Sequence, residues 1–419
     1  MAEDSAEELA LGVGSVLRHP GFVVGGGFDG GPGRGPERVE TGRLVADGGE
    51  VTAFGGDDDF EVLILERMSA AVEVRGGGHD HYRCITRRAW WRCYGKGCEL
   101  ACRVPTGGRG NRFQVGVVEG GEVEMPEFEG IVPAVVTPLD GEGGLKAGSL
   151  ERLLGRLYRA GSEGVYVCGQ TGEGLQLPLE VREQAVEVAV SQTPAGRTVI
   201  AHVGAGSTAD AVRLAKHAGR AGAQAVSSLP PGSAYSFEEV RGYYERLAEE
   251  AGLPVLVYYF PEFSASIRTV EQVLELCAIP GVIGLKFTDF DLYRMSILSR
   301  EGYTIYNGRD EVLAAGLLMG AHGGIGSFYN LIPELFVELY GHARAGRWRE
   351  VRVEQDRIND LIRAVLRFPL LAAIKSLLGW SGIDCGAPVP PRRVLTPEEE
   401  GALREAVRGA GFEPDRFLA

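Results

Sequence analysis

The sequence lacks the long apolar segments and the excess of positive charge that would direct it to a membrane or to nucleic acid. No run of about 18 apolar residues occurs, so no transmembrane helix is expected. The first residues, MAEDSAEELALGV, are acidic and lack the basic and apolar regions of a signal peptide. Lys and Arg number 43 against 57 Asp and Glu, giving a formal net charge of −14. We therefore expect a cytoplasmic protein that binds neither nucleic acid nor membrane.

Cysteine and lysine are also scarce. The seven cysteines are an odd number, and a long chain without a signal peptide is not expected to carry a disulfide framework. Only five of the 43 basic residues are lysine, at positions 96, 146, 216, 286 and 375. An enzyme that depends on a lysine therefore has few candidates in this chain.

Glycine, in contrast, is abundant, and its density changes along the chain. Residues 1–124 hold 26 of the 62 glycines and contain only short apolar runs. Glycine at this density raises the entropy cost of folding, so we expect a poorly ordered N-terminal extension. An alternative is that residues 1–124 are not native and that Met125 is the true start, because MPEFEGIVPAVVTP leads straight into a strand.

The same segment contains two histidines and four cysteines that are close enough in sequence to suggest zinc. The cysteines follow the spacing Cys-x8-Cys-x4-Cys-x3-Cys, without the Cys-x2-Cys pair typical of zinc sites. We therefore predict no metal site, and zinc binding stays an alternative that metal analysis of the purified protein would test. The residues of this Cys/His cluster are His79, His81, Cys84, Cys93, Cys98 and Cys102.

From residue 126 onward, apolar β-rich runs alternate with amphipathic helical stretches. Eight such units in about 200 residues predict an α/β fold of the (β/α)8 TIM-barrel type rather than an open sheet. We assign the barrel to residues 125–331, and the last barrel helix with a C-terminal helical extension to 332–419. The expected strands are 130–138, 164–169, 198–205, 223–231, 253–261, 281–289, 303–308 and 321–328.

Lys286 is the sharpest functional signal, because it interrupts the apolar strand GVIGLKFTD. A buried lysine is costly unless its pKa falls or it is paired. A neutral amine in an apolar pocket is the nucleophile that Schiff-base chemistry needs, whereas an amine that reaches solvent or forms a buried ion pair is the structural alternative. Alternation predicts one face, toward the barrel interior, with Val282, Gly284, Lys286 and Thr288, and an outer face with Ile283, Leu285 and Phe287.

Two further strand ends carry groups where barrel enzymes place their catalytic residues. Strand 253–261 ends in Tyr-Tyr-Phe-Pro, and the hydroxyl of Tyr258 there can both donate and accept a proton, although core packing also explains a tyrosine. Strand 164–169 runs into the turn GQTGE, where two glycines flank Thr171. Such a turn can direct backbone N–H groups and a hydroxyl toward a carboxylate.

The last two strands end in NGRDE and GGIGSFYN. Asp310 and Glu311 are candidates to accept hydrogen bonds from a polyol, and helix capping is their alternative role. Gly326 and Ser327 would let a substrate approach the backbone closely.

These motifs, each on its expected strand, resemble those of the N-acetylneuraminate lyase / dihydrodipicolinate synthase family, the class I aldolases that form Schiff bases. The resemblance covers about 127 to 412 and leaves the first 124 residues without a counterpart. It implies an enzyme that uses a 2-keto acid such as pyruvate, needs no metal and no organic cofactor, and assembles as a homotetramer.

The resemblance also implies roles for individual residues. Lys286 would form the imine with the keto acid, and Tyr258 would relay protons. Gln170 and Thr171 fall where the family binds the pyruvate carboxylate, and Gln170 departs from the usual Ser or Thr. The residues implied to bind substrate are Gln170, Thr171, Gly172, Thr288, Gly308, Asp310, Glu311, Gly326 and Ser327.

Two positions separate the branches of the family. Dihydrodipicolinate synthases usually have an arginine two residues after the turn proline, where this chain has Phe263, and a Tyr-Tyr pair where it has Gly232 and Ser233. The lyase branch matches better, so the leading prediction is a carbon–carbon lyase that cleaves or forms a 2-keto-3-deoxy sugar acid such as N-acetylneuraminate. A 4-hydroxy-tetrahydrodipicolinate synthase and a catalytically silent keto-acid-binding protein are the alternatives.

Overall fold

The structure is a computed structural model that describes residues 128–232 and 234–417, and in addition the backbone of seven short strands closer to the N-terminus. The chain divides into two compact units, Met1–Glu124 and Met125–Ala419.

The N-terminal unit contains strands that we did not predict. Five of them form a sheet in the order β1-β2-β3-β5-β6, and β4 pairs with β7. The side chains of the Cys/His cluster lie outside the described residues. The absence of a zinc site therefore stays a prediction, as does the expectation that residues 1–124 are poorly ordered or not native. The strands are β1 (Gly42–Ala46), β2 (Gly49–Gly56), β3 (Asp59–Ile64), β4 (Ala71–Val72), β5 (Tyr82–Thr86), β6 (Trp90–Cys93) and β7 (Val117–Val118).

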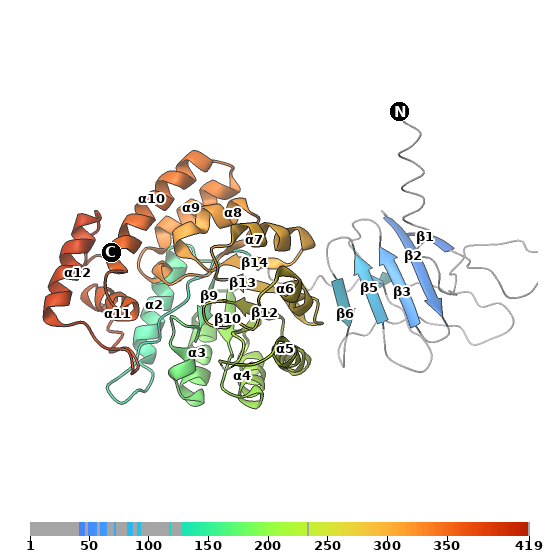
Figure 1. The fold of residues 1–419 in the computed structure, drawn as a ribbon, viewed down its shortest axis with the longest axis horizontal. Coiled ribbons are helices and arrows are strands. Elements are labelled where there is room, and N and C mark those ends of the chain that lie inside the picture. The colour runs from blue at the N-terminus through green and yellow to red at the C-terminus, as the bar shows by residue number, and fades with distance from the viewer. Residues whose placement is uncertain are drawn as a thin grey trace, which may run out of the picture. The chain divides into compact units, whose positions relative to one another are not determined.

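The C-terminal unit is a parallel eight-stranded barrel surrounded by helices (Figure 1). The ends of the sheet meet because the Tyr166 N–H donates to the Pro133 carbonyl over 2.8 Å and the Val135 N–H donates to the Tyr166 carbonyl over 2.9 Å. All eight predicted strands and the TIM barrel are confirmed. The strands are β8 (Gly130–Ile131), β9 (Gly164–Val167), β10 (Thr198–His202), β11 (Ala225–Ser228), β12 (Val255–Tyr259), β13 (Val282–Phe287), β14 (Thr304–Asn307) and β15 (Gly323–Gly324).

One helix follows each strand, and their ends carry the expected local signals. Ser236 and Glu239 form a reciprocal capping box at the start of α5, and Gly252 closes that helix in the left-handed conformation. Helices α10 to α12 then extend the chain beyond the barrel, as predicted. The helices are α2 (Ala147–Arg159), α3 (Leu179–Gln192), α4 (Thr208–Ala221), α5 (Phe237–Ala251), α6 (Val270–Cys277), α7 (Leu292–Leu298), α8 (Leu313–Leu318), α9 (Pro333–Arg344), α10 (Trp348–Val365), α11 (Leu370–Trp380) and α12 (Pro397–Gly409).

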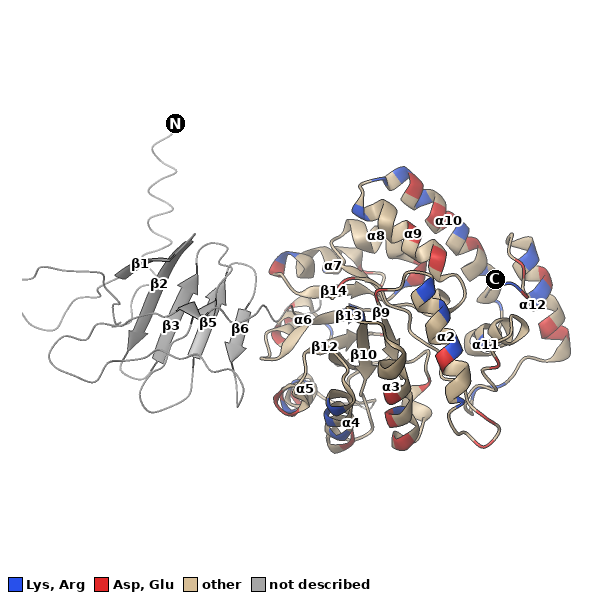
Figure 2. Cartoon of the chain, turned by 180° about the vertical axis from the view of Figure 1, so that it is seen from behind, with Lys and Arg blue, Asp and Glu red and all other residues tan. Residues whose placement is uncertain are grey.

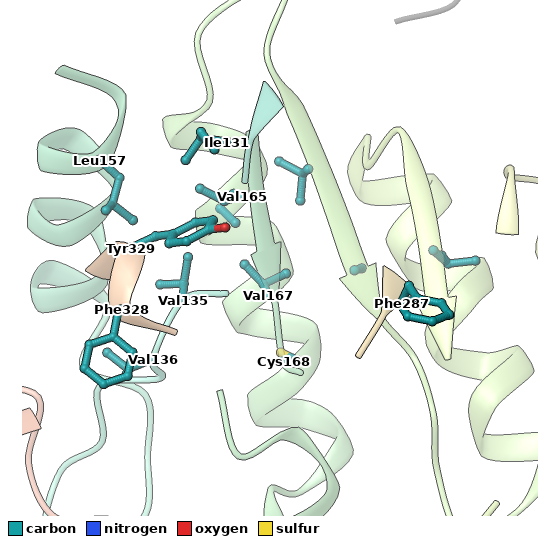
Figure 3. Packing of buried hydrophobic residues seen from close by; sticks show 14 of the residues in the cluster. Ile131, Val135, Val136, Leu157, Val165, Val167, Cys168, Phe287, Phe328 and Tyr329 are labelled. Atoms are coloured by element: carbon teal, nitrogen blue, oxygen red, sulfur yellow. The ribbon is translucent and has the colours of Figure 1, made fainter. Parts of the chain in front are cut away.

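Two apolar layers hold the barrel together. The larger lies between strands and helices, where residues such as Val165 and Val167 of β9 pack beside Leu157 of α2 (Figure 3). The smaller fills the barrel interior and includes Tyr166 and Tyr258. Charged residues of both signs occur along the outer helices instead (Figure 2). Of the helices within the described residues, none combines the length and the apolar character that a membrane span requires.

Strand β13 departs from regular alternation at its start. Val255 of β12 is paired with Val282, whereas the next residue, Leu256, is paired with Gly284. The extra residue, Ile283, therefore packs against the interior cluster, and Val282 belongs to the outer layer. The predicted orientations of Val282 and Ile283 are wrong, because this β-bulge offsets the alternation by one residue.

Beyond the bulge, alternation holds in the part of β13 that carries the candidate nucleophile. Leu285 and Phe287 belong to the outer layer, as predicted. Lys286, between them, contacts the interior tyrosines Tyr166 and Tyr258. A Cβ at Gly284 would lie 1.9 Å from the Thr304 carbonyl oxygen, so glycine is required for the close approach of β13 and β14.

Candidate active site

Lys286 lies near the carboxyl end of β13, directly between two tyrosines of the neighbouring strands. Its register partners are Tyr258 on β12 and Tyr306 on β14. The lysine is only 4% exposed. Its Nζ lies 4.2 Å from the ring centroid of Tyr258 and 4.6 Å from that of Tyr166. The salt bridges of lysine among the described residues belong to Lys146, Lys216 and Lys375, so the buried ion pair considered above for Lys286 is not the arrangement observed.

This environment changes the protonation of the amine. Burial lowers the pKa of Lys286 to about 7, and the charge of Asp310 opposes that shift. Near neutral pH a substantial fraction of the amine is then uncharged and carries a free electron pair. Burial also raises the pKa of Tyr258, so its hydroxyl keeps its proton and can donate it. The pair thus combines a nucleophile with a proton carrier.

Asp310 is a carboxylate whose charge acts on both Lys286 and Tyr258. It is buried just after β14, and its Oδ2 accepts a hydrogen bond of 2.9 Å from the Phe328 N–H. Its Oδ1 is buried without a partner among the described residues. Burial raises the pKa of Asp310 to about 7. A Cβ at Gly326 would lie 1.7 Å from Oδ1, which explains why that position is glycine.

The GQTGE turn lies at the carboxyl end of β9, and glycines within it and directly after it allow close backbone packing. A Cβ at Gly174 would lie 1.8 Å from the Cys168 carbonyl oxygen, and one at Gly172 would lie 2.9 Å from that of Val135. The Gly172 carbonyl accepts a 2.7 Å hydrogen bond from the Thr137 hydroxyl. Within the described residues, no hydrogen bond uses the N–H groups of Thr171 or Gly172. Two adjacent free N–H groups are a suitable site for a carboxylate.

The structure brings the turn against the last strand end. The hydroxyls of Thr171 and Ser327 are 2.6 Å apart. Both residues line a cleft of about 580 Å³, together with Gln170. The other wall of the cleft is formed by the C-terminal extension, including Pro369, Leu371 and Arg392. The predicted carboxylate site is therefore open on one side to a space large enough for a small ligand.

Three predicted site residues remain: Thr288, Gly308 and Glu311. Thr288 and Gly308 directly follow β13 and β14 and lie next to each other, since a Cβ at Gly308 would lie 2.1 Å from the Thr288 Oγ1. That hydroxyl is buried close to the Tyr258 hydroxyl, and their interaction opposes the rise of the Tyr258 pKa. Glu311 lies apart from them, because it lines a second cleft of about 420 Å³ beside Arg363 of α10. Its assignment as a substrate ligand stays a prediction, as do the other site assignments.

Two polar residues of the barrel interior, Tyr166 and His202, were not predicted from the sequence. Tyr166 forms part of the wall around the lysine amine, and its hydroxyl donates to Ser227 over 3.1 Å. His202 packs edge-on against Tyr258 with ring centroids 6.0 Å apart. Its Nε2 accepts from the Leu229 N–H, and burial holds the pKa of the imidazole well below its usual value. Alternation of side chains along the strand GVYVCG would have predicted that Tyr166 faces the barrel interior. No local pattern in the sequence indicated that His202 lies there as well.

The chain is a TIM-barrel enzyme of the carbon–carbon lyase class, because relatives that it resembles along the barrel are named N-acetylneuraminate lyase. Residues 127–410 match the model of the Dihydrodipicolinate synthetase family, and the chain belongs to that family. The predicted membership and enzyme class are thereby confirmed.

Individual relatives point to one branch of the family. An N-acetylneuraminate lyase of Rhizobium meliloti (strain 1021) is 35% identical over 285 residues, covering 67% of this chain and 95% of the relative. An N-acetylneuraminate lyase of Escherichia coli (strain K12 / DH10B) is 36% identical over 260 residues, covering 61% and 88%. The structure of a Ruminococcus gnavus sialic acid aldolase is similar with a TM-score of 0.65 at 28% identity, covering 68% of this chain and 97% of the other.

Proposed function

We propose that this protein is a Schiff-base aldolase that cleaves or forms a 2-keto-3-deoxy sugar acid, with pyruvate as one product or substrate. The observation that carries the proposal is the buried amine of Lys286, whose pKa is lowered to about 7 and which lies against the ring of Tyr258. An amine in this state attacks a ketone, whereas a protonated surface lysine does not.

In the proposed reaction, the free N–H groups at Thr171 and Gly172 hold the keto-acid carboxylate. Lys286 attacks the C2 ketone, and loss of water gives a protonated imine that can accept an electron pair. The Tyr258 oxygen accepts the proton of the C4 hydroxyl while its own proton passes to the substrate carboxylate, the C3–C4 bond breaks, and an aldehyde leaves. The enamine that remains is protonated and hydrolysed to pyruvate and the free amine. The protein's own acid–base groups suffice for every step, so neither a metal nor an organic cofactor is required.

The aldehyde part of the substrate is proposed to be a polyol. Asp310 has a buried oxygen without a partner among the described residues, Thr288 has a buried hydroxyl, and Ser327 adds a hydroxyl at the edge of the cleft. Sugar hydroxyls both donate and accept, so they can satisfy carboxylate and hydroxyl groups of this kind. The names of the relatives favour a sialic acid, and the replacement of the synthase arginine by Phe263 favours it over a substrate with a second carboxylate.

The decisive experiment is trapping of the imine with pyruvate and borohydride, followed by intact mass and peptide mapping. We expect one reduced pyruvate adduct per chain, on the peptide that contains Lys286. Assays should then compare cleavage of N-acetylneuraminate with condensation of pyruvate and aspartate semialdehyde. Faster condensation would favour the synthase instead, and a folded protein that forms no adduct would contradict the aldolase proposal.

The pH dependence of trapping gives a second prediction. The rate of imine formation should rise through about pH 7, because only the neutral amine of Lys286 is nucleophilic. Since the charge of Asp310 raises the pKa of Lys286, Asp310→Asn should move this midpoint to lower pH. Measurement of adduct formation against pH for both proteins tests this, with the exposed Glu245→Gln as the control. A midpoint that stays in place in Asp310→Asn would show that this carboxylate does not act on the amine.

The assembly and the location of the protein belong to the same proposal. Family membership supports a homotetramer, and the bacterial lyases among its relatives support a cytoplasmic enzyme. Light scattering of the purified full chain would measure the oligomeric state directly.

A further inference from the structure

The last residue of the GQTGE turn, Glu173, is a fully buried carboxylate. Its backbone is in the left-handed conformation, with φ of 55°, which is uncommon for a residue with a side chain. It lies two residues after Thr171, at the back of the proposed carboxylate site. The proposed reaction gives Glu173 no role, so both its burial and its backbone conformation need another explanation.

Within the described part of the chain, the polar partners of the Glu173 carboxylate come from the C-terminal extension. The Nζ of Lys375, on α11, lies 2.7 Å from Oε2, and both side chains are nearly inaccessible, at 2% and 0% exposed. The Val389 N–H donates to Oε1 over 2.7 Å. The Arg392 guanidinium lies 3.7 Å from the same oxygen and donates to Gln176 over 3.1 Å. These contacts fix the turn from outside the barrel.

The charges of this group do not cancel. One carboxylate faces two cations, which leaves one net positive charge directly behind the turn. Arg392 also lines the cleft, together with Gln170 and Thr171 of the turn. Positive charge at one rim of a cleft, next to free N–H groups, attracts and stabilises an anion.

We infer that Lys375, Glu173 and Arg392 form a positioning group for the keto-acid carboxylate: the ion pair holds the turn in shape, and Arg392 supplies the uncompensated charge. The C-terminal extension then contributes directly to binding of the substrate carboxylate, through Lys375 and Arg392. This inference rests on the proposed function, because it assumes a 2-keto acid as the ligand of the turn.

A merely structural role makes different predictions from a positioning role. If the group only anchored α11 to the barrel, its loss would lower stability and leave the dependence on keto-acid concentration unchanged. If it positions the turn, its loss raises KM for pyruvate while kcat changes little, because the lysine and tyrosine that perform the chemistry are untouched.

The test compares pyruvate KM and kcat for wild type, Arg392→Met and Arg392→Lys at low salt, with stability measured in parallel. Removal of the charge in Arg392→Met should raise KM about tenfold with kcat within about twofold, and Arg392→Lys should restore most of the loss. The neighbouring Arg393→Met should change KM less, because Arg393 is already bound to Glu399 by bonds of 2.6 and 2.7 Å.

The ion pair needs its own variants, because Lys375→Met leaves a buried carboxylate unpaired and can prevent folding. The double variant Glu173→Gln, Lys375→Met removes both charges, so it should fold and still show a raised KM. Arg156→Met serves as the stability control, because it breaks the Arg156 hydrogen bonds to Phe417 and Glu334 on another part of the chain. It should lower stability without changing KM.

The outcomes separate the two proposals. If wild type traps pyruvate but Arg392→Met and the double variant keep the wild-type KM, the positioning role is overturned and the aldolase proposal stands. If wild type forms no pyruvate adduct at all, the proposed function fails and this inference fails with it. A KM that rises in both variants but not in Arg156→Met is the result we expect.

Discussion

Replacement of Lys286 by Met is expected to abolish imine trapping and to lower the rate of cleavage by about 10⁴-fold or more. The physical reason is that no other described lysine can substitute for it. Lys375, also buried, is bound to Glu173, and Lys146 and Lys216 form ion pairs on the surface. The measurement is the mass of the borohydride-reduced protein after incubation with pyruvate, together with single-turnover cleavage rates.

The stability of the same variant provides the control. Burial lowers the pKa of Lys286, so between about pH 7 and its unfolded value the unfolded chain binds a proton that the folded chain lacks. Wild-type stability therefore rises with pH through that window, and below it the folded state carries the cost of a buried charge. Lys286→Met should lose this slope and be no less stable than wild type near pH 7. An adduct that persists in the folded variant would show that another residue forms the imine.

The second large effect is expected for Tyr258→Phe. Loss of the proton carrier should lower the rate of C3–C4 bond cleavage by about 10²- to 10⁴-fold, the usual range for one acid–base group. The phenyl ring keeps the packing against the Lys286 amine, whose distance to the ring centroid is 4.2 Å. Imine formation with pyruvate should therefore survive while cleavage fails. Single-turnover cleavage and borohydride trapping, measured on the same preparation, separate the two steps.

Tyr166→Phe is the matched comparison, because its ring also contacts the amine while its hydroxyl is bound to Ser227. We expect it to lower the cleavage rate by less than about tenfold. If Tyr166→Phe were the more damaging variant, the proton carrier would be Tyr166, and the assignment of Tyr258 would be wrong. Equal and small losses in both would mean that neither hydroxyl moves the proton.

Much of the fold was predictable because it is encoded locally. Strands and helices alternate along residues 126–412 with distinct apolar periods, and parallel strands joined by helices have few stable arrangements. The candidate nucleophile was predictable for a similar reason: a lysine within an apolar strand must either be neutral or be paired. The orientation of Val282 and Ile283 was not predictable, because a bulge is set by the partner strand β12 and leaves no mark in the residues themselves.

By itself the sequence determined the order of the barrel elements, the family and the chemical type of the candidate nucleophile, because each depends on residues that are close together in the chain. Only the tertiary structure decided which distant groups meet. Thr171 and Ser327 are separated by 156 positions and Glu173 and Val389 by 216, yet both pairs are in contact. Closure of the barrel brings the first pair together, and packing of the C-terminal extension against the barrel brings the second. Burial in the barrel interior lowers the pKa of Lys286. Contacts between residues so far apart in sequence depend on packing of the whole domain, so no local sequence pattern can predict them.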